Sequence, residues 1–431
     1  MAHPMPLRMK KNIQLIVYTG LIMFLPFVLK GQGTAEKYVD SLKQALQKAP
    51  NDSVQYSTLH RMYSYYEEKQ KDSALAIAQE MYKLSSRNNQ QLSKIINLGM
   101  MGYQQMGLGD YSSSLKNLLK ALEWSESTTV KQKNTWSIES GTRATTFPKG
   151  TEAKVVESQI NHILGNLLFN TGNLQQAKPF FRKARNIGKE TGYIFRLGMA
   201  SMNLGRCLLI ENKLDSALNL LQVSDSIAQI SPSSRYLAHI NTYLGDISQK
   251  KGDQKKASQY YHLAIYNGIK SQNFNGLAQA YIAVSQFFLL NKNSDSCIFY
   301  AQKCLEVIQD LGKSFSLIYV NKGNVYQNIY ESYLMAHQKD SAAKYRIIAL
   351  EQKDSINKVR IKTLIDFQQT LFENQLRLQK LEKDKIVGEN RNRTTLFVAG
   401  IVLVAVVSLL LYRNNRIKAK DNVILQNTLN E

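Results

Sequence analysis

The chain has 431 residues, a formal net charge of +22 and three cysteines. This length exceeds one ordinary domain, although a repeat array can reach it without a second core. Cys297 and Cys304 lie roughly 10 Å apart along one predicted helix, which is too far for a disulfide. The composition therefore excludes a disulfide framework, and we expect Cys207, Cys297 and Cys304 to be buried packing residues.

The basic charge balance limits the class of partner. An excess of Lys and Arg attracts acidic partners or anionic surfaces, although a solvated basic exterior explains the same charge. The sequence has no basic run interleaved with aromatic residues, the pattern that would single out nucleic acid. We therefore expect no nucleic-acid partner.

Residues 1–33 have the features of a targeting segment. Arg8, Lys10 and Lys11 precede the apolar run from Ile13 to Leu29, and small residues suited to cleavage follow at 31–33. The run is long for a signal peptide, so an uncleaved N-terminal anchor is the alternative. Both interpretations predict that the following domain is exported.

Residues 34–350 are predicted to form helical repeats, because a Leu-Gly pair returns every 40 residues. The members are Leu164-Gly165, Leu204-Gly205, Leu244-Gly245 and a degenerate Val284-Ser285. Seven positions after the Gly comes a turn residue (Gly172, Asn212, Gly252, with Lys292 as the exception), and twelve positions after it a small residue (Ala177, Ala217, Ala257, Cys297). At sixteen positions the residues are Phe181, Leu221, Tyr261 and Ala301.

The repeated Gly has a physical explanation. Inside a helix it costs about 1 kcal/mol relative to Ala, so its recurrence needs a packing reason. Without a Cβ it allows a second helix to approach closely, and the small residue twelve positions later lies near the crossing point. The turn supplies a helix stop and then a polar cap. Each unit is therefore an antiparallel helix pair that must stack on its neighbours to bury its apolar faces.

Two further pairs precede these repeats and one follows. The first spans roughly 54–84, the second contains Gly102 and Gly109, and the last covers roughly 315–350. About 23 residues are inserted near 125–150, since Gly102 and Gly165 are separated by 63 residues rather than 40. The insertion is rich in Ser, Thr and Lys and is predicted to be a surface loop; a short hairpin around Trp136 or a lid are the alternatives.

Residues 351–393 are predicted to form a long charged helix. Leu364, Leu371 and Leu378 are spaced by sevens, with Phe367 and Leu381 at companion positions. This is a partial coiled-coil seam, so residues 354–393 could pair with a second copy of the chain; a solitary capping helix is the alternative.

Residues 394–412 (TTLFVAGIVLVAVVSLLLY) are predicted to cross a membrane. This segment has 19 residues without a charge and covers roughly 28 Å as a helix, which matches the hydrocarbon core. Local charges would place the preceding segment inside, but long exported domains cross largely regardless of charge. We therefore predict the orientation from the N-terminal signal. The repeats lie outside, and residues 413–431 form a cytoplasmic juxtamembrane helix.

The repeat pattern resembles the tetratricopeptide repeat family. Gly165, Gly172, Ala177, Phe181 and Ala184 match its motif best, together with the equivalent set Gly245, Gly252, Ala257, Tyr261 and Ala264. The period is 40 rather than about 34, which we attribute to longer helices, and HEAT-type pairs remain the structural alternative. The resemblance implies an all-α superhelical solenoid whose groove receives a peptide or partner helix.

The whole layout resembles the input half of bacterial membrane sensors. In those proteins a histidine kinase or DNA-binding output domain follows in the cytoplasm. The helical tail reaches Glu431 without a Gly, a Pro or another stop signal, so it looks truncated. The resemblance implies sensory input to a signal-transduction system.

The sequence lacks motifs of catalysis. It has no HExxH pattern, and Gly312-Lys313-Ser314 lacks the upstream Gly of a phosphate-binding loop. The histidines form no close metal-ligand cluster, and no nucleophile elbow or kinase motif set occurs. We expect no enzyme activity, cofactor or metal in this chain.

Binding is the better hypothesis, with the concave face of the first helices as the contact surface. The candidate residues lie one turn before the repeating Gly, immediately after it, or one turn beyond: His162, Asn166, Phe169, Met202, Arg206, Thr242, Asp246, Gln249 and Gln286. We expect a single-pass membrane protein whose exported repeats bind a protein or peptide and relay occupancy across the bilayer. The alternatives are a non-signalling envelope scaffold, a cytosolic tail-anchored docking adaptor, and the sensory fragment of a longer kinase.

Overall fold

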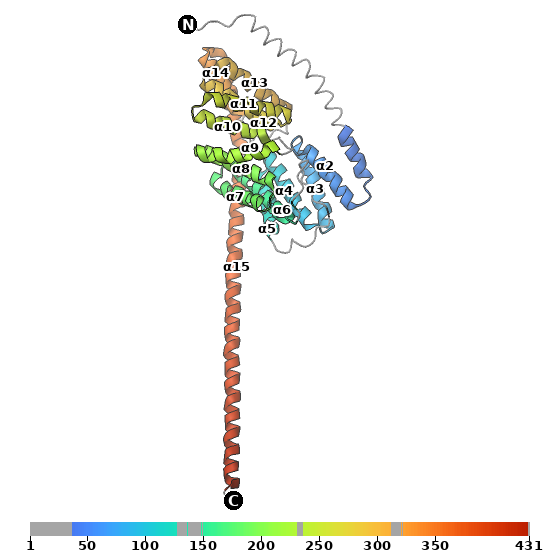
Figure 1. The fold of residues 1–431 in the computed structure, drawn as a ribbon, viewed down its shortest axis with the longest axis vertical. Helices are drawn as coiled ribbons and strands as arrows, with labels where there is room; N and C mark the ends of the chain where they lie inside the picture. The colour runs from blue at the N-terminus through green and yellow to red at the C-terminus, as the bar shows by residue number, and fades with distance from the viewer. Residues whose placement is uncertain are drawn as a thin grey trace. The chain divides into compact units, whose positions relative to one another are not determined.

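The computed structural model describes residues 37–126, 136, 148, 150–230, 236–311, 320 and 322–429. Within these ranges the regular structure is helical and contains no strand, as the sequence predicted (Figure 1). The chain divides into two units, Met1–Phe367 and Gln368–Glu431, which are considered separately below. The N-terminal targeting segment predicted at 1–33 lies outside the described residues.

The first unit is an array of adjacent antiparallel helix pairs (Figure 1). A helix at 37–47 precedes them. The pairs are α2 (Asp52–Tyr66) with α3 (Lys71–Arg87), α4 (Gln91–Gly107) with α5 (Tyr111–Glu126), α6 (Glu152–Asn170) with α7 (Leu174–Glu190), α8 (Ile194–Ile210) with α9 (Leu214–Ile230), α10 (Leu237–Lys250) with α11 (Gln254–Lys270), and α12 (Phe274–Leu290) with α13 (Ser294–Leu311). Helix α14 (Lys322–Met335) then packs against the beginning of α15 (Lys339–Leu429), where the rings of Tyr333 and Tyr345 stack at 5.4 Å.

The repeating glycines lie where the two helices of a pair touch. A Cβ on Gly165 would stand 2.6 Å from a ring carbon of Phe181, and a Cβ on Gly245 would stand 2.6 Å from the ring of Tyr261. The closest partner is thus sixteen residues after the Gly. The residue at twelve is also near, since a Cβ on Gly205 would lie 3.3 Å from the carbonyl oxygen of Ala217. The predicted packing role of the glycines is confirmed, and the large residue at sixteen is the side chain that fills the space of the missing Cβ.

The turns between paired helices share one left-handed residue. Gly172 and Gly252 have φ of +84° and +82°, and Asn212 has +60°. Lys292 stands at the equivalent place with φ of +58°, so the exception in the sequence pattern is not an exception in conformation. The backbone geometry of this turn is therefore fixed by the stacking of the pairs, and Lys292 bears the strain that a glycine would avoid.

Polar side chains cap several of the second helices, as predicted. Asp253 accepts a hydrogen bond from the backbone N–H of Lys256 at 3.0 Å, and Asn293 accepts one from Ser296 at 3.1 Å. Asn173 differs because its side-chain amide donates to Thr171 instead. These caps satisfy amides that the first turn of a helix leaves unpaired.

The three cysteines are free and buried, as predicted. Cys304 donates from its thiol to the carbonyl oxygen of Ala278 at 3.3 Å. Burial raises the pKa values of Cys207 and Cys304 to about 12. The thiols therefore act as small packing groups rather than as nucleophiles.

The insertion falls between the end of α5 at Glu126 and the start of α6 at Glu152. Trp136 packs against Tyr56 of α2, with ring centroids 4.9 Å apart, and its backbone N–H donates to the side-chain oxygen of Gln90 at 3.3 Å. The hairpin and lid alternatives concern residues outside those that the structure describes.

Helix α15 runs without a break from Lys339 to Leu429. The sequence predicts four parts in this stretch: the last repeat, a charged helix, a membrane segment and a tail. A single helix results because no Pro interrupts the stretch, and its Gly388 and Gly400 are tolerated inside a helix. The functional boundaries within α15 remain predictions from composition. Phe367 is buried within the first unit, whereas the predicted seam residue Leu381 is exposed.

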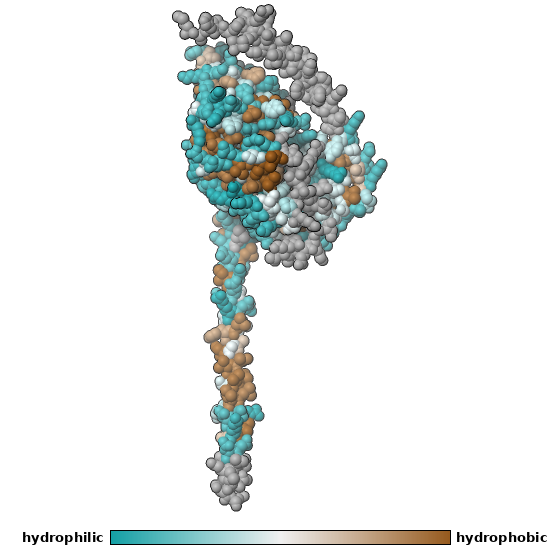
Figure 2. Space-filling model, in the orientation of Figure 1, coloured by the Kyte–Doolittle hydropathy of each residue, from teal (hydrophilic) through white to brown (hydrophobic). Residues whose placement is uncertain are grey.

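Among the described residues, one helix is long and apolar enough to cross a bilayer, judged by length and composition. It is the Leu364–Asn422 part of α15, whose most apolar window has a mean hydropathy of 2.7 and is not buried within the protein. Figure 2 shows this as a hydrophobic band around the helix between two hydrophilic stretches. Leu396, at one end of the band, is 74% exposed.

Candidate ligand-binding surface

The first helices of the pairs form the inner row of the array. Each of α4, α6, α8, α10 and α12 contacts the first helix of the next pair, up to α14. The second helices α5, α7, α9, α11 and α13 make no comparable contacts with one another within the described ranges. An array whose first helices are closer together than its second helices is curved, with the first helices on its concave side. This inner row carries all nine residues that the sequence analysis selected.

The structure separates these nine residues by accessibility. Six are partly or fully exposed: Asn166, Phe169, Arg206, Asp246, Gln249 and Gln286. The other three are buried, with His162 and Met202 4% exposed and Thr242 1% exposed. A ligand lying along the inner row could contact the first set directly, whereas the second set supports the row from beneath.

Arg206 of α8 and Phe169 of α6 form the most defined contact on this surface. The guanidinium lies 3.9 Å from the centre of the Phe169 ring and 5.8 Å from that of Tyr243 on α10. A cation over an aromatic face is attracted by the ring, and a planar guanidinium loses little freedom there. The contact holds a positive charge in a fixed orientation across three successive first helices.

A short polar chain lies beside this contact. The side-chain amide of Asn203 donates to the Asn166 oxygen at 2.9 Å and lies 3.3 Å from Nε2 of His162. An amide N–H can donate only to an unprotonated ring nitrogen, so Nε2 accepts and Nδ1 carries the proton of a neutral imidazole. Burial, reinforced by the charge of Arg196, holds the pKa of His162 well below its ordinary value. His162 is therefore neutral at pH 7.

Asp246 and Gln249 face the second helix of their own pair. The Tyr261 hydroxyl of α11 lies 2.8 Å from the Asp246 carboxylate and 2.7 Å from the Gln249 side-chain oxygen. Gly245 makes this possible because the Tyr261 ring occupies the space of its missing Cβ. Burial raises the pKa of Asp246 to about 6, against the opposing effects of the Tyr261 hydrogen bond and the charge of Lys250.

Asp246→Asn should stabilise the protein at neutral pH. The folded state holds the Asp246 proton more tightly than the unfolded state, whose pKa is 3.8, so wild-type stability falls as pH rises from about 4 to about 6. A shift of about two units corresponds to about 3 kcal/mol, and partial exposure of the side chain reduces this to about 2 kcal/mol. Asparagine has no such titration, so its stability should be flat across this window. Urea unfolding at pH 4.5 and 7.5 measures the difference. The control Asp295→Asn replaces an exposed carboxylate and should keep the wild-type pH dependence of stability. If stability fell equally between pH 4.5 and 7.5 in both variants, Asp246 would not be the group responsible.

Two contributors to this surface were missed by sequence reasoning. Asn203 links the polar chain, and Arg196 lies seven residues before it on the same face of α8. Arg196 is only 7% exposed and its Nε has no hydrogen-bond partner. The spacing of Arg196, Asn203 and Arg206 places all three along one stripe of the helix. Extending the search by about three turns from Arg206 toward the start of α8 would have found them.

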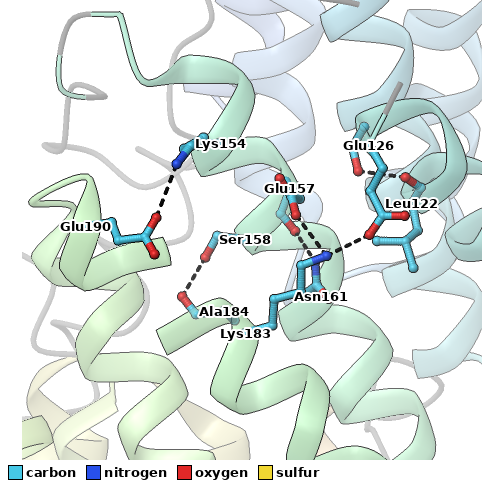
Figure 3. A network of polar contacts seen from close by, with 10 residues as sticks. Leu122, Glu126, Lys154, Glu157, Ser158, Asn161, Lys183, Ala184 and Glu190 are labelled. Atoms are coloured by element: carbon cyan, nitrogen blue, oxygen red, sulfur yellow. Dashed lines mark hydrogen bonds and ion pairs between the residues drawn. The ribbon is translucent and has the colours of Figure 1, made fainter. Parts of the chain in front are cut away.

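A second polar region lies between α6 and α7 and carries an ion-pair network (Figure 3). Lys183 of α7 pairs with Glu126 at 2.6 Å and with Glu157 at 2.9 Å, while Lys154 pairs with Glu190 at 3.2 Å. Burial lowers the pKa of Lys183, but its hydrogen bonds to the two carboxylates raise it by more. The network lines a depression of about 540 Å³. Since its lysines are already paired with carboxylates, it joins α7 to the end of α5 and is not our candidate site.

The described residues contain no group of three or more His, Cys, Asp or Glu placed to hold a metal ion. The acidic and imidazole groups of the inner row instead contact hydroxyl and amide groups. The candidate surface is therefore one of hydrogen bonds, one stacked guanidinium and aromatic rings.

Comparison with known proteins finds a family match over part of the chain. The tetratricopeptide repeat family matches residues 158–185, a segment from α6 into α7 that contains Gly165, Ala177, Phe181 and Ala184. This segment matches a tetratricopeptide repeat, and the array has a solenoid fold like that of tetratricopeptide repeat proteins. The match favours this type of helix pair over the HEAT-type alternative. The 40-residue period of these repeats reflects longer helices, as predicted: α8 and α9 have 17 residues each and are joined by three residues.

Solved structures share the fold of this tetratricopeptide repeat array. A Rap protein complexed with Competence and Sporulation Factor is 12% identical, with a TM-score of 0.54 over 75% of this chain and 81% of that one. The Rap conjugation gene regulator of the plasmid pLS20, in complex with the Phr* peptide, is 16% identical, with a TM-score of 0.53 over 73% of this chain and 78% of that one. No curated protein matches the chain significantly. At these identities the likeness concerns the fold alone.

Proposed function

We propose that the tetratricopeptide repeats are exported and bind a peptide or protein segment along the inner row of first helices. Occupancy would be relayed through α15 across one membrane span, as the sensory input of a signal-transduction system. The observation that carries the binding proposal is the Arg206 guanidinium stacked on Phe169, half-exposed on the inner row between flanking amides. An oriented cation of this kind suits carboxylate and backbone carbonyl groups of an extended ligand.

The fold relatives support a peptide as the ligand. Both Rap structures contain arrays of similar fold, one complexed with Competence and Sporulation Factor and the other with the Phr* peptide. For this chain we restrict the direct contacts to the six accessible residues, Asn166, Phe169, Arg206, Asp246, Gln249 and Gln286. Buried His162, Met202 and Thr242 would hold these residues in position.

The membrane part of the proposal rests on the apolar band of α15 and on the N-terminal apolar run. A helical segment of 19 uncharged residues matches the thickness of a bilayer core. Since the N-terminal run has the features of an export signal, we place the repeats outside the cell membrane and residues 413–431 inside. A ligand that changes the curvature of the array would then act on the helix that leaves it.

Charge reversal at Arg206 tests the binding surface. Peptides are selected by display on the full chain in detergent micelles, and their affinities are then measured for Arg206→Glu. We expect at least a tenfold loss, because the variant removes the stacked cation and repels a carboxylate. Arg182→Glu is the matched control, since Arg182 is exposed on the second helix α7 and the variant makes the same charge change. Unchanged affinity of Arg206→Glu, or an equal loss in Arg182→Glu, would refute the proposed surface.

A further inference from the structure

Four large apolar side chains of α15 are exposed ahead of the apolar band. They are Ile361, Ile365, Phe372 and Leu376, which are separated by intervals of four, seven and four residues. Their side chains are between 49% and 61% exposed. Large exposed apolar residues that recur at a fixed spacing indicate a contact surface, whereas scattered ones are ordinary. We call these four residues the α15 stripe.

The α15 stripe occupies one face of the helix. Intervals of four and seven alternate with a period of eleven residues, and eleven residues make three turns of an α-helix. Helix α15 continues through this part of the chain without a break, so the four side chains stay in line over about 22 Å. The same spacing reaches Asp354 and Lys383, whose charges end the apolar run on either side.

The heptad seam predicted from the sequence lies on a different face. Phe367, a central residue of that seam, is 0% exposed and is buried within the first unit. Ile365 precedes it by two residues, which turns it about 200° around the helix. At Phe367 the heptad face is therefore used inside the same chain, and the α15 stripe is the face left for a partner.

The composition of the α15 stripe suits a second copy of itself. When two identical helices run in parallel, each residue of the seam faces its own counterpart, so a charge in the seam would repel its copy. No charge occurs in the stripe between Ile361 and Leu376. Gln368 and Gln369 flank it on either side and are exposed amides, which can both donate and accept hydrogen bonds across a pair.

We propose that α15 pairs in parallel with the α15 of a second copy of the chain through this stripe. The inference rests on the proposed function, because one span per chain gives all copies the same orientation and places identical residues at the same height above the bilayer. A seam of about 22 Å is small for free partners, since stable interfaces usually bury about 1,600 Å² in total. Copies held in one bilayer meet at a high effective concentration, so a short seam suffices for them and not for a soluble partner.

The pairing would act on the membrane segment directly. Helix α15 continues from the stripe into the apolar band, and Leu376 lies about 30 Å before Leu396 along the helix axis. Two paired helices would therefore bring two spans side by side. A ligand that shifts one array against the other would change the contact between the spans.

Disulfide crosslinking of the full chain in membrane vesicles tests the pairing. Leu376→Cys places a thiol on the stripe, and Leu381→Cys places one about 140° away, at a position of the predicted heptad seam. The two leucines are matched, with exposures of 49% and 55%, and the natural cysteines are buried and provide the background. On mild oxidation we expect at least about fivefold more covalent dimer from Leu376→Cys than from Leu381→Cys, since only the former brings two Cα atoms within reach of a disulfide.

A charge placed in the seam separates pairing from chance collision. Phe372→Lys is added to Leu376→Cys and should reduce the dimer yield to the level of Leu381→Cys, because two ammonium groups would face each other. Gln375→Lys adds the same charge at an exposed position beside the seam and should keep the yield. Both changes are at exposed positions, so thermal unfolding of the array should be unaffected and loss of folding would not explain the result.

Two results would overturn the pairing. One is an equal dimer yield from Leu376→Cys and Leu381→Cys, and the other is an equal effect of Phe372→Lys and Gln375→Lys. A mixed disulfide between Ile361→Cys in one copy and Leu376→Cys in another would show antiparallel pairing and would contradict the parallel arrangement.

The outcomes also separate the pairing from the peptide surface. If Leu376→Cys forms dimers while Arg206→Glu leaves peptide binding unchanged, the peptide surface fails and the pairing stands. If Arg206→Glu loses peptide binding while Leu376→Cys forms no dimer, the pairing fails alone.

Discussion

Gly245→Val should destabilise the repeat array by about 3 kcal/mol. The first added carbon would lie 2.6 Å from two ring carbons of Tyr261, closer than any real contact. The ring cannot move aside easily, because it is 1% exposed, contacts Phe287 at 5.5 Å and is hydrogen-bonded at its hydroxyl. Overpacking of a closed core typically costs 1–3 kcal/mol, and the β-branched residue adds no compensating contact.

Two comparisons isolate this effect from helix propensity. Gly388→Val makes the same change in a helix where a Cβ would meet nothing within 4 Å, so it should be neutral or slightly stabilising. Replacing Tyr261 with Leu in the Gly245→Val background should recover part of the loss, giving a coupling energy above about 1 kcal/mol. Urea unfolding of the wild type, Gly245→Val, Gly388→Val, Tyr261→Leu alone and the double variant measures these differences. Additive effects of the two substitutions would show that the pair does not touch in the way described.

Truncation after Arg393 should move the protein from the membrane to the soluble fraction. The removed segment contains the apolar band of α15. The side chains of this band are exposed, so they are stable in the hydrocarbon core of a bilayer and not in water. Because Ile13–Leu29 is a second apolar run, the comparison is made in chains that begin at Thr34. We expect nearly all of the full-length form to resist carbonate extraction and nearly all of the truncated form to be released.

A second truncation provides the matched control. Ending the chain after Tyr412 removes only the charged tail, so this form should stay with the membrane like the full-length form. Release of the Tyr412 form, or retention of the Arg393 form, would show that residues 394–412 are not the anchor. Circular dichroism of the released form should still report a helical array, since the repeats end well before the truncation.

The packing of the pairs was accessible from the sequence because a close helix crossing needs a residue without a Cβ. Gly165 and Gly245 therefore fixed both the period and the place of contact. The identity of the closest partner was less accessible: Phe181 and Tyr261 recur at sixteen residues, but only coordinates show that their rings fill the space beside the glycines. Likewise, the left-handed conformation of Lys292 could not be predicted from its residue type, because the packing of the neighbouring helices imposes it.

The candidate surface was only partly predictable. Spacing from the repeating Gly identifies the inner face of a helix, but not which side chains a neighbouring first helix covers. His162 and Thr242 are covered, whereas Arg206 and Gln286 are accessible. Arg196 was missed for a different reason. Its burial, and an Nε without a hydrogen-bond partner among the described residues, are visible only in the folded chain.

The division of the C-terminal part into separate helices was the least predictable feature. Composition changes sharply near 350 and 394, yet the backbone continues as one helix because no residue there prevents it. The composition of a segment thus predicts whether water or lipid surrounds it. The backbone shows only that the segment is helical. The proposed relay uses both, as one helix that begins in the repeats and includes the apolar band.

Photocrosslinking from the inner row is the most direct test of the account. A photoreactive residue replaces either Gln286 on the first helix α12 or Gln302 on the second helix α13, both of which are exposed. Each full chain is irradiated with a peptide selected on the wild type. We expect labelling of the peptide from position 286 and none above background from position 302. Equal labelling from both positions, or labelling from 302 alone, would contradict the claim that the first helices form the binding face.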